Sequence, residues 1–287
     1  MQDSLVTTVP EMSFGTDETL YLLVDGAQIE GLAKQLYSLS GKLDLEPIYL
    51  FEPYNELVEV SPYVIAATDS VKQWFLELNQ PMAGFFFSSP LGLEHIADGL
   101  RVLIQVESPY GSSVFLKFAN SECSYVLLST NTPYLWKVMT QAWLPIRKGW
   151  KYIAQPDFLP SIGSGKYKLT EEQWQLMGQI TWRNTLEKIE QHMRRWFPET
   201  MVQLSSKEQW IEQQADYAYQ SGFSSERDLL LFFNVIGFLG LKAIESPEEY
   251  PDIYQLIHQS SLQTPSQRVE AAAELAYQYS QSQEKHA

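Results

Sequence analysis

One segment of the chain has several of the residue types of a phosphate-binding loop. Residues 161–167, Ser-Ile-Gly-Ser-Gly-Lys-Tyr, contain the Gly-Lys pair of the pattern G-x-x-x-x-G-K-[ST]. Pro160 stands where that pattern needs its first glycine, and Tyr167 stands where it needs the hydroxyl residue that binds magnesium. The segment is therefore interpreted as a flexible connection.

The other chemistry-bearing residues do not form a catalytic or metal motif in the sequence. A zinc site needs about three or four convergent ligands, and none of the histidines stands in a known zinc motif; they are His95, His192, His258 and His286. Glu94, His95 and Asp98 have the spacing of one helix face, for which a solvated helix start is the favoured interpretation. The sequence has no G-x-S-x-G element, and Cys123 precedes an apolar run typical of a buried, inert thiol. We therefore expect no catalytic residue, no metal and no cofactor.

The charge and the cysteine content narrow the class of protein. The 287 residues include 35 acidic and 20 basic side chains, for a net charge of −15. Such a chain repels phosphate backbones and anionic lipid headgroups, so nucleic acid and membrane are poor partners. A single cysteine cannot form an internal disulfide, and the first residues lack the basic start and apolar run of a signal peptide. We expect a soluble, cytoplasmic protein.

Along residues 1–154, short apolar runs alternate with segments of helical periodicity. This pattern predicts a mixed lobe of the α+β or α/β class, built on a central sheet. Strands are expected at 20–24, 47–51, 63–67, 83–88 and 113–118, and helices at 29–40, 70–79 and 91–107. Gly41 is the expected stop of the first helix. The three consecutive phenylalanines 85–87 favour a central strand over a ligand site.

The second half of the chain predicts helices alone. Residues 155–169 are rich in Pro, Gly and Ser and are expected to be a linker, so that 170–287 form a helical lobe. Thr170 and Gln173 match a capping box at the start of a helix that Pro198 ends. Further helices are expected at 207–221, 249–258 and 265–282. Another helix is expected to begin after a cap at Ser224 or Ser225.

Four tryptophans of the helical lobe are candidate partner-binding residues, because Trp often anchors protein interfaces. They are Trp174, Trp182, Trp196 and Trp210. The alternative is that all four are buried in the core, since Trp is highly buried on average.

Several segments, in order, resemble the family of domain of unknown function 4123, also known as Tap or TEC adaptors. They are Leu20 to Gln28, Pro47 to Leu50, Ser61 to Ile65, Leu100 through Val114 to Phe118, and Ala218 to Asp228. Asp25, Gly26, Ala27 and Gln28 belong to the opening motif and are expected to shape the fold. Where the family commonly has an Arg and an Asp, this chain has Lys117 and Asn120, so a bridge between these positions would be weakened.

The resemblance implies a non-enzymatic adaptor of type VI secretion. Such an adaptor binds its cognate toxic effector in the bacterial cytosol and loads it onto the spike, a VgrG or PAAR protein. Two other functions stay open from the residues alone. One is an enzyme, such as a hydrolase, with residues scattered around a cleft between the lobes, and the other is an immunity-type protein that neutralises a toxin.

Overall fold

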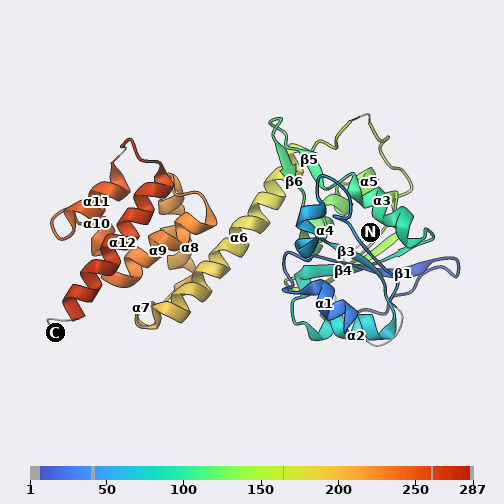
Figure 1. Ribbon diagram of the computed structural model, residues 1–287, viewed down its shortest axis with the longest axis horizontal. Coiled ribbons are helices and arrows are strands. Elements are labelled where there is room, and N and C mark those ends of the chain that lie inside the picture. Colours follow the sequence, from blue (N-terminus) through green and yellow to red (C-terminus); the bar gives the residue numbers. More distant parts are fainter. Residues whose placement is uncertain (1–6, 40–42, 164, 260, 285–287) are drawn as a thin grey trace. The chain divides into compact units, whose positions relative to one another are not determined.

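The computed structural model describes residues 7–39, 43–163, 165–259 and 261–284. Gly41, Ser164 and His286 lie outside these ranges. The chain divides into two compact units, Met1–Ile180 and Thr181–Ala287. The first is built on an antiparallel sheet, and the second consists of helices and connecting turns, without a strand among its described residues (Figure 1). The predicted fold class is therefore confirmed, as a mixed α/β unit followed by a helical one.

Within the part of the chain that the structure describes, the sheet of the first unit has six strands in the order β2-β3-β1-β4-β7-β8. Their bounds are β1 Thr19–Val24, β2 Leu45–Pro47, β3 Tyr63–Ala66, β4 Gly84–Ser89, β7 Gln141–Ile146 and β8 Gly149–Ala154. Every neighbouring pair is antiparallel. A separate two-stranded sheet pairs β5 (Gln105–Glu107) with β6 (Ser113–Phe115).

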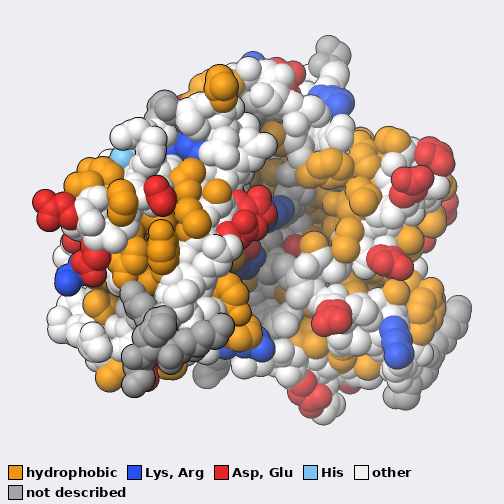
Figure 2. Space-filling model, turned by 60° about the vertical axis from the view of Figure 1, so that its left-hand side comes forward, with side chains coloured by type: hydrophobic (Ala, Val, Ile, Leu, Met, Phe, Trp, Pro, Cys, Tyr) orange, Lys and Arg blue, Asp and Glu red, His pale blue; other side chains and the backbone are white. Residues whose placement is uncertain are grey.

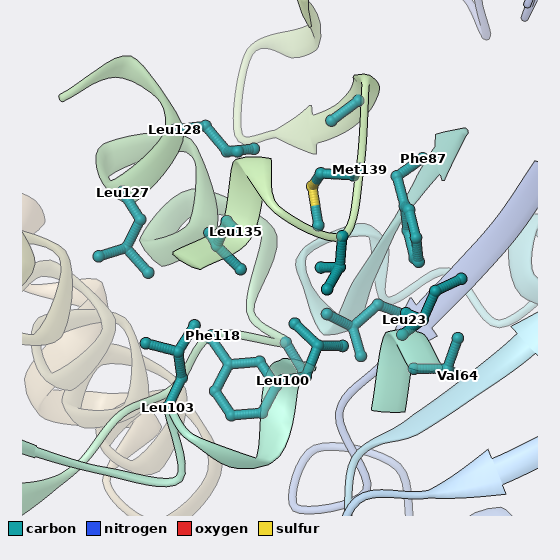
Figure 3. Packing of buried hydrophobic residues seen from close by; sticks show 14 of the residues in the cluster. Leu23, Val64, Phe87, Leu100, Leu103, Phe118, Leu127, Leu128, Leu135 and Met139 are labelled. Carbon is teal, nitrogen blue, oxygen red and sulfur yellow. The ribbon is translucent and has the colours of Figure 1, made fainter. Parts of the chain in front are cut away.

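Helices cover both faces of the sheet, which explains why its central strands are apolar along their whole length. Figure 1 shows α1 (Leu32–Tyr37) and α2 (Asp69–Glu77) on one side and α3 (Leu93–Arg101), α4 (Ser121–Ser129) and α5 (Pro133–Trp136) on the other. Phe85 and Phe87 point into the core under α3, α4 and α5, and Phe86 points into the core under α1 and α2. Figure 3 shows the first of these cores, with Leu23, Phe87 and Leu100 among its residues.

Among its described residues, the second unit contains the C-terminal half of α6 (Glu171–Trp196) and six further helices. They are α7 Pro198–Val202, α8 Lys207–Gln220, α9 Glu226–Leu239, α10 Lys242–Glu245, α11 Pro251–His258 and α12 Pro265–Glu284. The core lies around the apolar helix α9, where Phe232 and Phe233 are fully buried. Both predicted caps are confirmed. Thr170 and Gln173 exchange hydrogen bonds of 3.0 and 3.1 Å, and Ser225 accepts from the Asp228 amide at 3.1 Å.

The boundary between the two units falls inside α6. Its N-terminal half carries Leu176, Met177 and Ile180, which pack on Cys123 and Val126 of α4. Cys123 is buried, as expected. Tyr167 and Leu169 are hydrogen-bonded to Glu107 of β5 at 2.8 Å each. We still propose that the chain has two lobes, residues 1–154 and 170–287, joined by a linker at 155–169.

Four predicted elements of the first unit are wrong in their bounds, and one of them, the strand expected at 113–118, is β6 and ends at Phe115. The strand expected at 47–51 is β2, which ends at Pro47. The chain leaves the sheet there, because the Tyr49 amide bonds to the side-chain hydroxyl of Ser61 instead of to a neighbouring strand. The helix expected at 91–107 ends at Arg101, and Gln105–Glu107 instead pair with β6 as a strand. The helix expected at 29–40 begins only at Leu32, since Gly31 before it is left-handed, with a φ of 63°.

Candidate partner-binding surface

The turn after β1 is closed by the Asp25 side chain. The Ala27 amide donates to one carboxylate oxygen at 3.0 Å, and the Gln28 side-chain amide donates to the other at 2.7 Å. The Asp25 amide donates to the carbonyl of Ala83 at 2.7 Å, which ties the turn to η2 (Pro81–Ala83). A short acidic side chain that accepts from nearby amides fixes a turn of this kind.

Gly26 lies directly against the chain at Val60 and Ser61. A β-carbon at position 26 would stand 2.2 Å from the carbonyl oxygen of Ser61 and 2.9 Å from the carbonyl carbon of Val60. Both atoms belong to the backbone, so neither can swing aside as a flexible side chain would. The turn at Asp25 and Gly26 therefore packs directly against the backbone of residues 60 and 61.

Ser61 holds the same stretch from within. Its buried hydroxyl accepts from the Tyr49 amide at 2.9 Å and donates to the carbonyl of Pro62 at 2.8 Å. Burial, and then the charges of Asp25 and Tyr54, raise the pKa of Tyr49 to about 12. The phenol of Tyr49 therefore stays neutral at physiological pH and can remain half-buried beside the turn.

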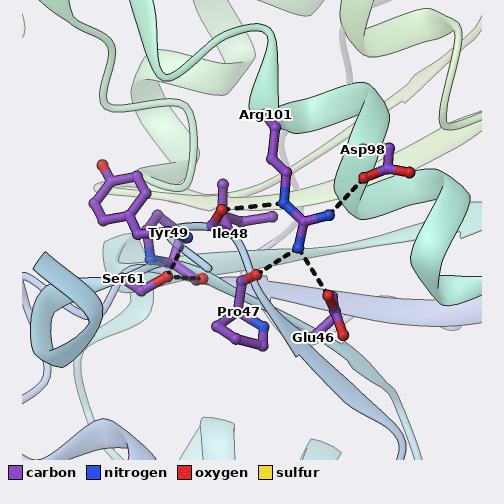
Figure 4. A network of polar contacts seen from close by, with 8 residues as sticks. Glu46, Pro47, Ile48, Tyr49, Ser61, Asp98 and Arg101 are labelled. Atoms are coloured by element: carbon purple, nitrogen blue, oxygen red, sulfur yellow. Dashed lines mark hydrogen bonds and ion pairs between the residues drawn. The ribbon is translucent and has the colours of Figure 1, made fainter. Parts of the chain in front are cut away.

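Arg101, at the C-terminus of α3, holds the other end of this stretch (Figure 4). Its guanidinium donates to the carbonyls of Ile48 at 3.2 Å and Pro47 at 2.9 Å, and it pairs with the Glu46 carboxylate at 2.7 Å. The same group lies over the Phe51 ring, 4.7 Å from its centroid. One side chain thus fastens the chain as it leaves β2.

Between these two fixed ends lies an exposed stretch, residues 50–60, which we call the 50–60 segment. It contains η1 (Asn55–Val60) and no buried residue. Its exposed large apolar side chains are Leu50, Phe51, Leu57, Val58 and Val60, with 38 to 58% of each surface accessible. Glu52, Glu56 and Glu59 are also exposed. Figure 2 shows hydrophobic side chains gathered in patches on the face it presents, with acidic side chains among them.

The apolar run at 47–51 predicts a buried strand that includes Phe51, so the sequence pattern does not predict this surface. A signal was present, since carboxylates recur at every third or fourth residue of 52–59 and a buried strand would not tolerate them.

The four predicted tryptophans are divided between the two units. Trp174 belongs to the first unit, where it packs edge-on against Tyr110. In the second unit, Trp182 packs against Tyr219 and Trp210 against Phe233, and both indoles are half-buried. Trp196 is exposed over 61% of its surface, with the Arg195 guanidinium 5.1 Å from its ring.

The two positions that depart from the family pattern have different environments. Asn120 is buried and caps α4, since its side-chain oxygen accepts from the Cys123 amide at 3.0 Å. Its side-chain NH₂ donates to the carbonyl of Met82 at 3.2 Å. Lys117 is exposed. The neutral residue at 120 therefore has its own hydrogen-bonding partners in this chain.

The cavity most relevant to an enzymatic alternative lies beside α3. It has a volume of about 650 Å³ and is lined by residues that include His95, Asp98, Tyr134 and Lys137. The Asp98 carboxylate is paired with Arg101 at 2.5 Å. Across the described ranges, no three His, Cys, Asp or Glu side chains are placed to hold a metal ion. Within the same ranges, no helix has both the length and the apolar character required to cross a membrane.

Comparisons with known proteins place this surface in a shared region. Residues 20–137 match the family model described as domain of unknown function (DUF4123). The chain is 60% identical over 278 residues to a Vibrio cholerae serotype O1 protein named accessory protein VasW, covering 96% of this chain and 94% of that protein. No solved structure matches the chain. The Asp25 turn, the 50–60 segment and Arg101 all lie within the matched residues.

Proposed function

Because the chain belongs to the family of domain of unknown function 4123, we propose that it is a non-enzymatic adaptor of type VI secretion. It binds a cognate toxic effector in the bacterial cytosol and loads it onto the secretion spike. The observation that carries this proposal is the 60% identity to an accessory protein along almost the whole chain. Exposed apolar side chains on both units support it, because a binding protein needs such anchors.

Deleting the gene should remove one effector from the secreted proteins while the spike is still secreted, because only the loading step is lost. The measurement is quantitative mass spectrometry of culture supernatants from the parent and the deletion strain. The purified full chain should then bind the missing effector directly. Unchanged secretion of all effectors would contradict the adaptor function.

The same strain separates an adaptor from an immunity protein. Loss of an adaptor leaves the producing cell unharmed, whereas loss of an immunity protein exposes it to its own toxin. We therefore expect normal growth of the deletion strain in pure culture. Growth arrest that an inactive effector relieves would favour the immunity-type alternative.

We further propose that the second unit contributes most to the choice of effector, with Trp196 as an anchor. Trp196 and Val202, at the ends of α6 and α7, are exposed over 61 and 79% of their surfaces. Central Trp anchors often account for about 2 kcal/mol or more of binding free energy.

Trp196→Ser should therefore weaken effector binding by roughly tenfold or more. Calorimetry with the full chain and the purified effector measures this, and Tyr277→Ser, which alters another exposed ring of the second unit, is the matched control. Equal affinities for both variants and the parent would refute the role of Trp196.

A further inference from the structure

The 50–60 segment exposes more apolar surface than an isolated side chain does. Single exposed hydrophobic residues are ordinary on a protein surface, whereas several large ones within one short segment favour an interaction site. Five large apolar side chains occur within these eleven residues, none of them less than 38% exposed. Tyr54 extends the group to β6, because its ring packs edge-on against Phe115, which is itself 51% exposed, with centroids 5.9 Å apart.

The backbone of this surface is held in place by hydrogen bonds. Within the segment, the Tyr54 amide donates to the Phe51 carbonyl at 2.9 Å and the Leu57 amide to the Tyr54 carbonyl at 2.8 Å. The Ser61 amide closes the stretch by donating to the Val58 carbonyl at 3.2 Å. Together with Arg101 at the start of the stretch, these bonds preorganise the surface. Binding at this surface therefore loses less conformational entropy than binding at a mobile loop would.

The charges on the segment specify the chemistry of the partner. Glu52, Glu56 and Glu59 are exposed and alternate with the apolar side chains, and the whole chain carries a net charge of −15. This arrangement favours an apolar stretch flanked by Lys and Arg, whose charges complement the carboxylates. Anionic lipids and nucleic acids are disfavoured for the same reason.

We infer that the 50–60 segment, together with Phe115, is the docking surface for an apolar polypeptide segment flanked by Lys and Arg on the spike protein. This inference rests on the proposed function. Of the two partners in that function, the spike fits better, because the surface lies within residues 20–137, which match the family model. A surface in the part shared by a family suits a partner that the members have in common, whereas each cognate effector differs.

The test uses the purified full chain, the spike protein and the effector, with each affinity measured separately by calorimetry. The first variant is Leu57→Ser with Val58→Ser, which removes two exposed apolar side chains. We expect spike affinity to fall by about tenfold or more and effector affinity to stay unchanged. Val202→Ser, at an exposed apolar position in the second unit, is the matched control and should leave spike affinity unchanged.

The second variant, Glu56→Lys with Glu59→Lys, tests the charge and alters only exposed side chains. We expect the parent to bind the spike more weakly as salt rises from about 0.05 to 0.5 M, since salt screens exposed charges. The variant should bind more weakly at low salt and lose most of that salt dependence. Thermal melting of all variants confirms that each remains folded.

The other outcomes are separable. Spike affinity equal to the parent's in both variants would refute the surface. Loss of effector binding alone would refute the spike as occupant and leave the adaptor function standing. If the apolar variant instead abolished a dimer seen by light scattering, the surface would join two copies of this chain. If the parent bound neither protein, the adaptor function would fail and this inference with it.

Discussion

Replacing Gly26 with alanine should destabilise the first unit by about 3 kcal/mol, because overpacking against a rigid neighbour costs that much. The added β-carbon would stand 2.2 Å from the backbone oxygen of Ser61. Relief requires that either the Asp25 turn or the end of the 50–60 segment moves. Both are tied by hydrogen bonds, the turn to Ala83 and Ser61 to the Val58 carbonyl.

Hydrogen-exchange mass spectrometry of the full chain measures this effect unit by unit. Amides of β1 and β3 that exchange by opening of the sheet should exchange roughly a hundredfold faster in the variant. Peptides from α9 and α12 serve as an internal reference, because they belong to the second unit.

Gly178→Ala is the matched control and should have the opposite sign. Gly178 lies inside α6 and an added β-carbon there meets no atom within 4 Å. Alanine is favoured over glycine in a helix interior by about 0.8–1.0 kcal/mol, so α6 should exchange more slowly. Similar exchange of β1 in the Gly26 and Gly178 variants would show that the close contact at Gly26 costs nothing.

Replacing Arg101 with leucine should cost about 2–3 kcal/mol, since hydrogen bonds to a charged group are the stronger kind. The carbonyls of Pro47 and Ile48 would lose their guanidinium donor, and Glu46 would lose its paired charge. Amides 48–62 should exchange faster, and spike affinity should fall because the docking surface is no longer preorganised. Arg101→Lys should be intermediate, since it retains the charge without the planar fork.

Arg227→Leu is the control for the loss of an arginine. Its ion pair with Glu270 joins two side chains that are 59 and 45% exposed, and exposed pairs contribute about 0–1 kcal/mol. This variant should leave both spike affinity and exchange in the first unit unchanged. Equal behaviour of the Arg101 and Arg227 variants would refute the positioning role of Arg101.

The sequence by itself determined the elements whose signals are local. The run Leu20–Val24 and the three phenylalanines 85–87 are apolar without interruption, and they form β1 and β4. Thr170 and Gln173 form a cap within four consecutive residues, and this cap begins α6 as expected. The helical lobe follows the 3.6-residue period for the same reason, because helical contacts join residues close in sequence.

The order of strands was decided only in the tertiary structure. β1 pairs with β3 on one side and with β4 on the other, and β7 and β8 are added from far along the chain. Every pairing between neighbouring strands of this sheet is antiparallel, although alternating strands and helices are also compatible with a parallel sheet. Local pattern cannot distinguish these arrangements, because the partners of each strand lie many residues away.

The candidate surface was likewise decided by contacts distant in sequence. Pro47 to Phe51 is as apolar as a buried strand, yet β2 ends at Pro47 and Phe51 is exposed. There are three causes. The Tyr49 amide bonds to the Ser61 hydroxyl, and the Arg101 guanidinium donates hydrogen bonds to the carbonyls of Pro47 and Ile48. The backbone at Ser61 also leaves room only for a glycine at position 26. These partners come from three other parts of the chain. The carboxylates of 52–59 argue against a buried strand, but the path of the 50–60 segment follows from contacts that its local pattern does not specify.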